Sequence, residues 1–170
     1  KRFENNQDQP HEWNRGAYLV NNLGHCSACH TPRNILGAEN KSLALTGGTY
    51  QDRLPDGQYR DWHAVDLTSS EKGLDQWTTT DLVDYLKLGI NSYTTVFGPM
   101  NKVVATSTQF LSDSDLLAMT SYLKSLPGQT SPNTTTNSDK RSIARGETLY
   151  AVHCATCHLP TGKGDKDTGP

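Results

Sequence analysis

Two copies of one short motif contain every cysteine of this chain. Each copy is a C-x-x-C pair followed directly by a histidine. The residues are Cys26, Cys29 and His30 in the first copy, and Cys154, Cys157 and His158 in the second. C-x-x-C-H is the attachment motif of c-type haem, because thiols at this spacing reach the two vinyl groups of one porphyrin and form thioethers. We therefore predict two haem c groups.

The histidine of each motif is the predicted axial ligand of a haem iron. His30 and His158 directly follow the second thiol, which places an imidazole under the metal. The neutral Nε2 atom would bind iron. The ring would be held by a hydrogen bond from Nδ1–H to a carbonyl or another acceptor.

C-x-x-C pairs have two other common uses. A redox-active dithiol is typical of a βαβ pattern, and the chain shows no such pattern. Four thiolates could bind zinc, but zinc ribbons place their two pairs about 15–20 residues apart. Here the pairs lie near opposite ends of the chain. A zinc-binding C-x-x-C protein stays as an alternative.

A low-spin electron carrier needs a sixth iron ligand, and Met/His ligation gives a relatively high reduction potential. The chain has two methionines. Met119 lies on the apolar stripe of a predicted helix, so we expect it in the core. Met100 sits in FGPMNK, which we predict to be a loop that holds its thioether against the first iron. No methionine or histidine follows His158, and Lys163 and Lys166 are expected to be solvated.

Three further side chains are candidates for the haem pocket. Arg33 follows the first motif in CHTPRN, and its guanidinium either binds haem propionates or is solvated at the surface. Trp62 and Trp77 are expected to wall the pocket, which is also the ordinary role of core aromatics. His63 is expected to be a surface loop residue.

Composition excludes some classes of protein. The chain has 170 residues and a formal net charge of −2, which argues against nucleic-acid binding. No apolar run approaches the roughly 18–20 residues of a membrane span. Hydrophobic residues make up 34% of the chain, below the roughly 45–50% of typical globular domains. A bulky apolar cofactor that completes the core explains this deficit.

Helices are predicted on both sides of a loop-rich region. A short helix from about Asn14, the predicted N-cap, leads into the first motif. Residues 31–77 contain many turn-forming combinations of Gly, Pro and Asp, so we expect a short hairpin there at most.

Two stronger helices follow, and each has a clear start signal. Thr78 and Asp81 have capping-box spacing, and Gly89 is a natural stop for that helix. Ser112 and Asp115 have the same spacing before an apolar stripe that includes Met119 and ends at Pro127-Gly128.

The chain divides into two unequal units. Residues 1–13 are predicted to be an incoming linker, and 14–127 the first haem domain. Residues 128–140 are a polar linker, and 141–170 the start of a further domain that is incomplete here. An Arg-Gly pair and a histidine precede each motif at similar offsets, so the units are an internal repeat.

Four segments of the chain resemble one family. They are EWNRGAYLVNNLGHCSACHTPRNILGAE, WTTTDLVDYLKLG, FGPMNKVVATSTQFLSDSDLLAMTSYLKSLPG and RGETLYAVHCATCHLPTGKG. Together they are similar to the cytochrome c subunit of membrane-bound bacterial alcohol, aldehyde, gluconate, sorbitol and fructose dehydrogenases. The resemblance covers most of residues 12–170. Family members typically contain three cytochrome c domains, and this chain resembles the middle one and the start of the third.

The resemblance implies a fold class, a site and a role. The fold would be mainly α, with tandem cytochrome c-type domains, long haem-wrapping loops and an incomplete second domain. Cys26, Cys29, His30 and Met100 would serve the middle haem, and Cys154, Cys157 and His158 the last haem, of three in the full protein. The chain would be a non-catalytic electron-transfer subunit in the bacterial periplasm, associated with the membrane through its partners.

The resemblance also implies redox partners. Electrons would come from a flavin- or quinone-dependent dehydrogenase catalytic subunit and pass to ubiquinone or a terminal oxidase. A different class of function, a di-haem peroxidase, would need an exchangeable sixth site beside acid–base residues. No His–Glu pairing near either motif indicates one.

Overall fold

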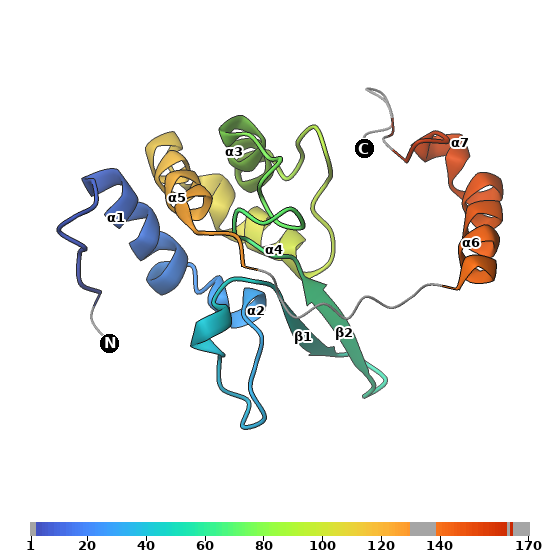
Figure 1. Cartoon of the computed structure of the whole chain (residues 1–170), viewed down its shortest axis with the longest axis horizontal. Helices are drawn as coiled ribbons and strands as arrows, with labels where there is room; N and C mark the ends of the chain where they lie inside the picture. Colours follow the sequence, from blue (N-terminus) through green and yellow to red (C-terminus); the bar gives the residue numbers. More distant parts are fainter. Residues whose placement is uncertain (1–2, 130–138, 163, 165–170) are drawn as a thin grey trace.

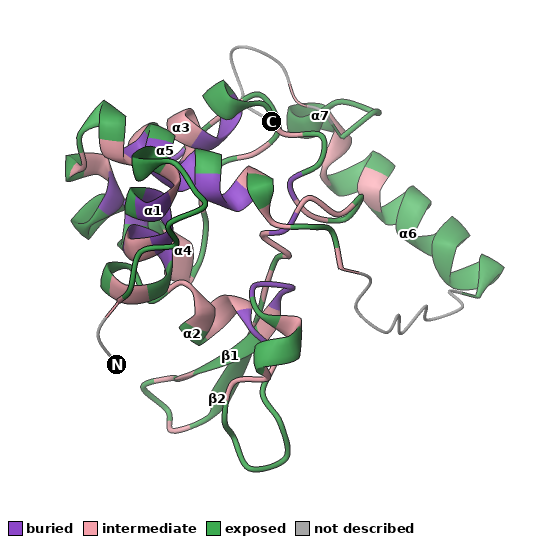
Figure 2. Cartoon of the chain, turned by 60° about the vertical axis from the view of Figure 1, so that its left-hand side comes forward, coloured by how far each residue is buried: buried purple, intermediate pink, exposed green. Residues whose placement is uncertain are grey.

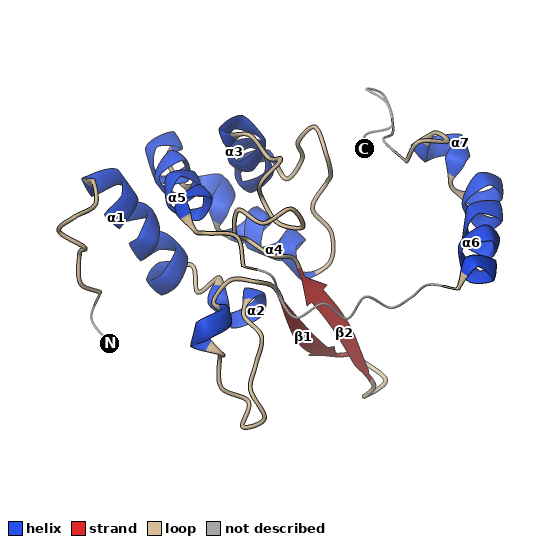
Figure 3. Ribbon diagram, viewed as in Figure 1, coloured by secondary structure: helices blue, strands red, loops and turns tan. Residues whose placement is uncertain are grey.

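A computed structural model describes residues 3–129, 139–162 and 164 of the chain (Figure 1). These residues are mainly helical, and one small antiparallel hairpin is the exception (Figure 3). The α-helices are α1 (His11–Tyr18), α2 (Ser27–His30), α3 (Thr79–Leu88), α4 (Pro99–Thr106), α5 (Asp113–Ser125), α6 (Lys140–His153) and α7 (Ala155–His158). Short π or 3₁₀ turns lie at Leu19–Leu23, Lys41–Leu43 and Thr108–Phe110. The mainly α prediction is confirmed.

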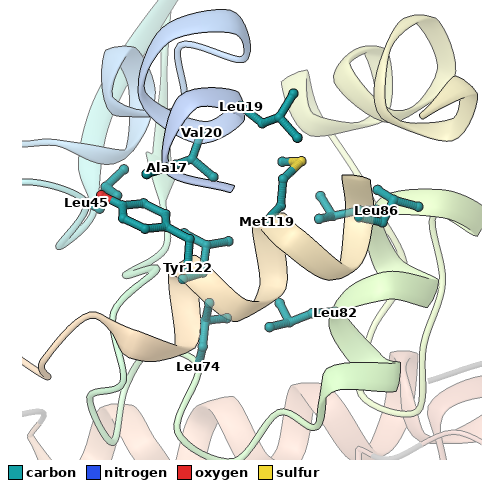
Figure 4. Close-up of a cluster of buried hydrophobic side chains, with 11 residues drawn as sticks. Ala17, Leu19, Val20, Leu45, Leu74, Leu82, Leu86, Met119 and Tyr122 are labelled. Carbon is teal, nitrogen blue, oxygen red and sulfur yellow. The ribbon is translucent and has the colours of Figure 1, made fainter. Parts of the chain in front are cut away.

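The core lies where α1, α3 and α5 pack together (Figure 4). Apolar residues spaced three or four apart on α3 and α5 supply much of it, as helical periodicity requires. Met119 is 4% exposed, which confirms that this methionine packs in the core. The other buried members of the cluster are Ala17, Leu19, Val20, Leu45, Leu74, Leu82, Leu86, Leu116, Tyr122 and Leu123.

Helix α1 begins at His11, inside the segment predicted as a linker. Asn14 is therefore not the N-cap but a buried residue within the helix. Its side chain accepts a hydrogen bond from the amide of Asn6 (2.7 Å) and donates to the carbonyl of Gln9 (3.1 Å). Asn14 thus fixes the incoming chain against α1. A polar residue at this position therefore indicated a buried hydrogen-bonding side chain rather than a helix cap.

The start of α3 follows its capping box in full. The Thr78 side chain accepts from the amide of Asp81, and the Asp81 carboxylate accepts from the amide of Thr78 (2.9 Å). The start of α5 follows only half of the predicted box. Ser112 caps the amide of Asp115 (3.2 Å), but the Asp115 carboxylate binds Arg15 instead.

The loop-rich region contains one hairpin, as the turn residues predicted. Strand β1 (Gly48–Arg53) pairs antiparallel with β2 (Tyr59–Ala64), and Tyr50 lies opposite Trp62. After α3, however, the predicted loop around FGPMNK contains helix α4. Proline at the first helical position is favourable there, because its missing N–H would have had no partner within the helix.

Residues 130–138 of the predicted linker lie outside the described residues, and α6 begins at Lys140 (Figure 1). The second motif runs from Cys154, the N-cap of α7, to the end of that helix. No residue of α6 is buried among the described residues, and Ile143, Leu149 and Val152 are exposed (Figure 2). Across the described part of the chain, the helices are all too short or too polar to cross a bilayer.

Candidate haem sites

The first C-x-x-C-H motif forms a short helix of its own. The preceding helix widens into a π-turn at Leu19–Leu23, and the chain then changes direction at His25, whose φ of 51° is left-handed. The amide of His30 donates to the carbonyl of Cys26 (3.0 Å), which closes one helical turn across the motif. Both thiols and the imidazole are therefore presented by a single turn of helix.

Both cysteines of this motif are free thiols and half-buried. Cys26 packs against the hydrophobic core, and its burial raises the pKa of its thiol to about 11. The thiol of Cys26 is therefore neutral at neutral pH. This apolar setting suits a thioether, which carries no charge.

His30 is oriented by a backbone carbonyl. Its Nδ1 lies 2.8 Å from the carbonyl oxygen of Val65. Because a carbonyl only accepts, Nδ1 carries the proton and the lone pair is left on Nε2. Burial lowers the pKa of His30, partly opposed by the Val65 hydrogen bond, so the ring is neutral near pH 7. This is the form of imidazole that binds iron.

Hydrogen bonds from the segment Leu45 to Gly47 hold the motif in place. The amide of Gly47 donates to the carbonyl of His30 (2.9 Å). The amide of Leu45 donates to Oγ1 of the buried Thr31 (2.9 Å), and the carbonyl of Leu45 accepts from the amide of Leu67 (2.8 Å). The segment from Leu45 to Gly47 therefore links the haem motif to the chain around Leu67.

Met100 lies in the first turn of α4 rather than in a loop, which corrects the sequence prediction. It is half-buried and packs against the same hydrophobic core as Cys26. The candidate thioether and the motif thus lie against one common core.

Trp62 lies beside the turn that carries Met100. A Cβ added at Gly98, the N-cap of α4, would lie 2.5 Å from the Trp62 ring, and the Trp62 and Phe97 ring centroids are 6.4 Å apart. The indole Nε1 is buried and makes no geometrically sound hydrogen bond. The pKa of the nearby Asp52 carboxyl is lowered mainly by Arg60, and the Trp62 indole N–H lowers it further. These contacts give Trp62 a structural role, and its place in the haem pocket stays a prediction.

Trp77 packs against the outside of the core. Its ring stacks on Tyr93 (centroids 5.7 Å apart) and meets the edge of Tyr85 (5.4 Å), and its carbonyl accepts from Nζ of Lys124 (2.5 Å). These contacts give Trp77 a structural role. Its place in the haem pocket stays a prediction.

Arg33 braces the loop that follows the motif. Its guanidinium donates to the carbonyl of Gly37 (2.9 Å) and to that of Ala28 (3.0 Å), which lies between the two cysteines. The sequence suggested either a propionate ligand or a solvated side chain, and this bracing role was missed. A residue in CHTPRN gives no sign of which carbonyls its side chain will reach.

The second motif shares the backbone hydrogen bond that closes the first. The amide of His158 donates to the carbonyl of Cys154 (2.9 Å), as His30 does to Cys26. Tyr150 closes the end of α7 from α6, because its hydroxyl donates to the carbonyl of Leu159 (2.8 Å). Lys163 and Lys166 lie outside the described residues.

Sequence comparisons identify relatives of the chain. It is 36% identical over 179 residues to the fructose dehydrogenase cytochrome subunit of Gluconobacter japonicus, covering 92% of this chain and 35% of that protein. It is 42% identical over 161 residues to the cytochrome c subunit of the quinone alcohol dehydrogenase of Gluconobacter oxydans, covering 88% and 33%. The chain is a homologue of dehydrogenase cytochrome c subunits. It spans about a third of the length of these relatives.

Haem c follows as the cofactor from this homology. A dihaem c-type cytochrome of Cereibacter sphaeroides is 40% identical over 117 residues, covering 68% of this chain and 36% of that protein. The four cysteines of the chain fit two attachment sites of the kind that such cytochromes use. No protein-family profile matches the chain.

The structure gives no support to the zinc alternative. Zinc needs four thiolate or imidazole ligands within one shell. No three His, Cys, Asp or Glu side chains among the described residues are grouped to hold a metal ion. Each motif of this cytochrome c homologue therefore stands alone, with its single histidine.

A shallow surface depression beside α1 contains none of the residues predicted to bind haem. It is lined by Phe3, Asn5, His11, Asn14, Arg15 and Tyr18. The depression therefore adds no residue to the two predicted haem sites.

Sequence reasoning missed the residues that position His30. Val65 contributes only a carbonyl, which any residue type supplies, and Thr31 contributes a buried hydroxyl. Pro99 gave a usable signal, because proline is favoured at the first position of a helix, and α4 begins at this residue.

Proposed function

We propose that this chain is part of a multi-haem c-type cytochrome that transfers electrons for a dehydrogenase. The observation that carries the proposal is the orientation of His30, whose Nδ1 is bound by a carbonyl so that Nε2 is left to bind a metal. The homology to dehydrogenase cytochrome c subunits supports it.

Named residues would hold each haem. Cys26 and Cys29 would bind the first haem covalently, with His30 and Met100 as its axial ligands. Cys154, Cys157 and His158 would bind the second haem. Bound haem iron would supply one-electron redox chemistry. The protein residues would set its potential through ligand identity, burial and the hydrogen bond to His30.

The partners follow from the names of the relatives and from the resemblance of the sequence. Electrons would come from a flavin- or quinone-dependent catalytic subunit and leave to ubiquinone or a terminal oxidase. The site would lie in the bacterial periplasm and be associated with the membrane through that complex. The chain itself would make no bond to the organic substrate.

An absorption spectrum of the purified protein, oxidised and then reduced with dithionite, tests this proposal. We expect a c-type spectrum with two haems per chain and, in the oxidised form, the far-red band of a methionine–iron bond. Met100→Ala should remove that band and lower the reduction potential of one haem, because a thioether ligand favours ferrous iron. Met119→Leu is the control and should keep the band.

Other spectra would contradict the proposal at separate points. A colourless protein would exclude haem. Two haems without the far-red band would exclude Met100 as a ligand and favour an exchangeable sixth site, as in a peroxidase. Rapid turnover of peroxide with a cytochrome donor would then identify an enzyme.

A further inference from the structure

The carbonyl that orients His30 is not held by its own side chain. Val65 is 62% exposed, so packing of its isopropyl group contributes little to the position of its backbone. The carbonyl must keep its 2.8 Å distance to Nδ1 of His30 through the residues that flank it. The preceding residue, Ala64, pairs with Gly48 in the hairpin, and the next residue, Asp66, is half-buried and hydrogen-bonded through its carboxylate.

Both carboxylate oxygens of Asp66 accept short hydrogen bonds. Oδ1 accepts from the amide of Thr68 (2.7 Å), and Oδ2 accepts from the hydroxyl of Ser70 (2.7 Å). Hydrogen bonds to an ionised carboxylate are stronger than those between neutral groups. Together they close a tight turn over residues 66–70 and fix the peptide that precedes it.

This turn is anchored to the rest of the domain. The amide of Leu67 donates to Leu45 (2.8 Å), within the segment that also binds His30. The amide of Ser69 donates to the carbonyl of Leu126 (3.1 Å), and its hydroxyl donates to the carbonyl of Lys124 (2.8 Å) at the end of α5. The turn is thus a rigid base from which the Val65 carbonyl reaches the imidazole.

We propose that Asp66 is a positioning residue for the first haem. Asp66 fixes the Val65 carbonyl, and this hydrogen bond controls how strongly His30 donates electrons to the iron. The inference rests on the proposed function, in which His30 is an iron ligand. A firm hydrogen bond at Nδ1 makes an imidazole a better electron donor, which favours ferric iron and lowers the reduction potential. Loosening the turn raises that potential.

Three substitutions in the holoprotein separate positioning from charge. Asp66→Ala removes both acceptors, and it should raise the potential of one haem and shift the paramagnetic NMR signals of its axial histidine. Ser70→Ala removes one hydrogen bond. It should shift the potential and the histidine signals in the same direction as Asp66→Ala, but by a smaller amount. Asp66→Asn keeps an acceptor for Thr68 and can donate to Ser70, so it should restore most of the wild-type values.

A matched control is available in the hairpin. Asp56 accepts from the amide of Gln58 (3.0 Å), the same two-residue spacing as Asp66 and Thr68, in a turn that contains no candidate ligand. Asp56→Ala should leave both haem potentials unchanged. The second haem is an internal reference in each variant.

Three results would overturn the inference. The first is a wild-type potential with unchanged histidine signals in Asp66→Ala. The second is a shift of the haem potential in Asp56→Ala as large as that in Asp66→Ala. The third is an Asp66→Asn variant whose potential and histidine signals match those of Asp66→Ala. Failure of the proposed function would be visible earlier, because the unmodified protein would then lack a histidine-ligated c-type spectrum.

Discussion

At the scale of single residues, the candidate site depends on how closely Trp62 approaches the start of α4. Gly98 has a φ of +57°, and a Cβ there would lie 2.5 Å from the indole. Gly98→Ala is expected to reduce the free energy of unfolding by about 1–3 kcal/mol. It should also weaken the methionine–iron band, since Met100 must move with the turn. Urea denaturation and the far-red spectrum measure the two effects.

Gly37→Ala is the matched control for this residue-scale prediction. Gly37 also has a positive φ (+77°), but no atom lies within 4 Å of an added Cβ. It should show backbone strain alone and leave the methionine–iron band unchanged. If both variants kept the band and lost equal stability, contact with Trp62 would not be the reason that position 98 requires glycine.

At the scale of elements, α1 and α5 cross where a side chain cannot fit. A Cβ on Gly16 would overlap the carbonyl oxygen of Ala118, whereas a Cβ on Gly146 of α6 meets nothing within 4 Å. Gly16→Ala is therefore expected to reduce the free energy of unfolding by about 1–3 kcal/mol. Gly146→Ala should instead stabilise its helix by about 0.5–1 kcal/mol. Circular dichroism during denaturation measures both changes, and a neutral Gly16→Ala would contradict this close crossing.

The same two helices are joined by an ion pair that depends on pH. Arg15 Nε lies 2.8 Å from Asp115 Oδ1, and this hydrogen bond is the main cause that lowers the pKa of the Asp115 carboxyl. Stability from a lowered pKa is present above the unfolded pKa, about 3.9, and is lost as pH falls through the folded pKa. The pair is partly exposed, so its contribution is at most about 1 kcal/mol.

Asp115→Asn tests this pH dependence. The variant should lose less stability than the wild type between about pH 5 and pH 2, when the free energy of unfolding is measured by urea denaturation. Asp113→Asn is the control, because this residue is two positions away, is 84% exposed at its side chain and makes only a longer contact with Lys87 (3.6 Å). Equal acid sensitivity in the wild type and Asp115→Asn would show that the pair does not contribute.

At the scale of the whole molecule, the two motifs are expected to load haem independently. The first unit has its own hydrophobic core, and α7 is closed locally by Tyr150. Replacing Cys154 and Cys157 with Ser should reduce the haem count from two to one and leave the far-red band intact. Haem per chain by pyridine haemochrome and mass spectrometry measures this. Loss of both haems would contradict independent loading.

The sequence by itself determined the chemistry and the strongest helices. Covalent haem attachment needs only local spacing, so C-x-x-C-H identified the cofactor without knowledge of the fold. The capping box at Thr78 and Asp81 and the stripe that contains Met119 were equally local signals, and the structure contains both.

Only the tertiary structure decided which groups orient that chemistry. The Val65 carbonyl reaches His30 across 35 positions of sequence, and Asp115 leaves its predicted capping role to bind Arg15 across 100. Such partners depend on how distant segments pack. The sequence around a carbonyl or a surface carboxylate does not indicate which distant group it will contact. Local patterns therefore predict what a residue can do, while long-range contacts determine what it does.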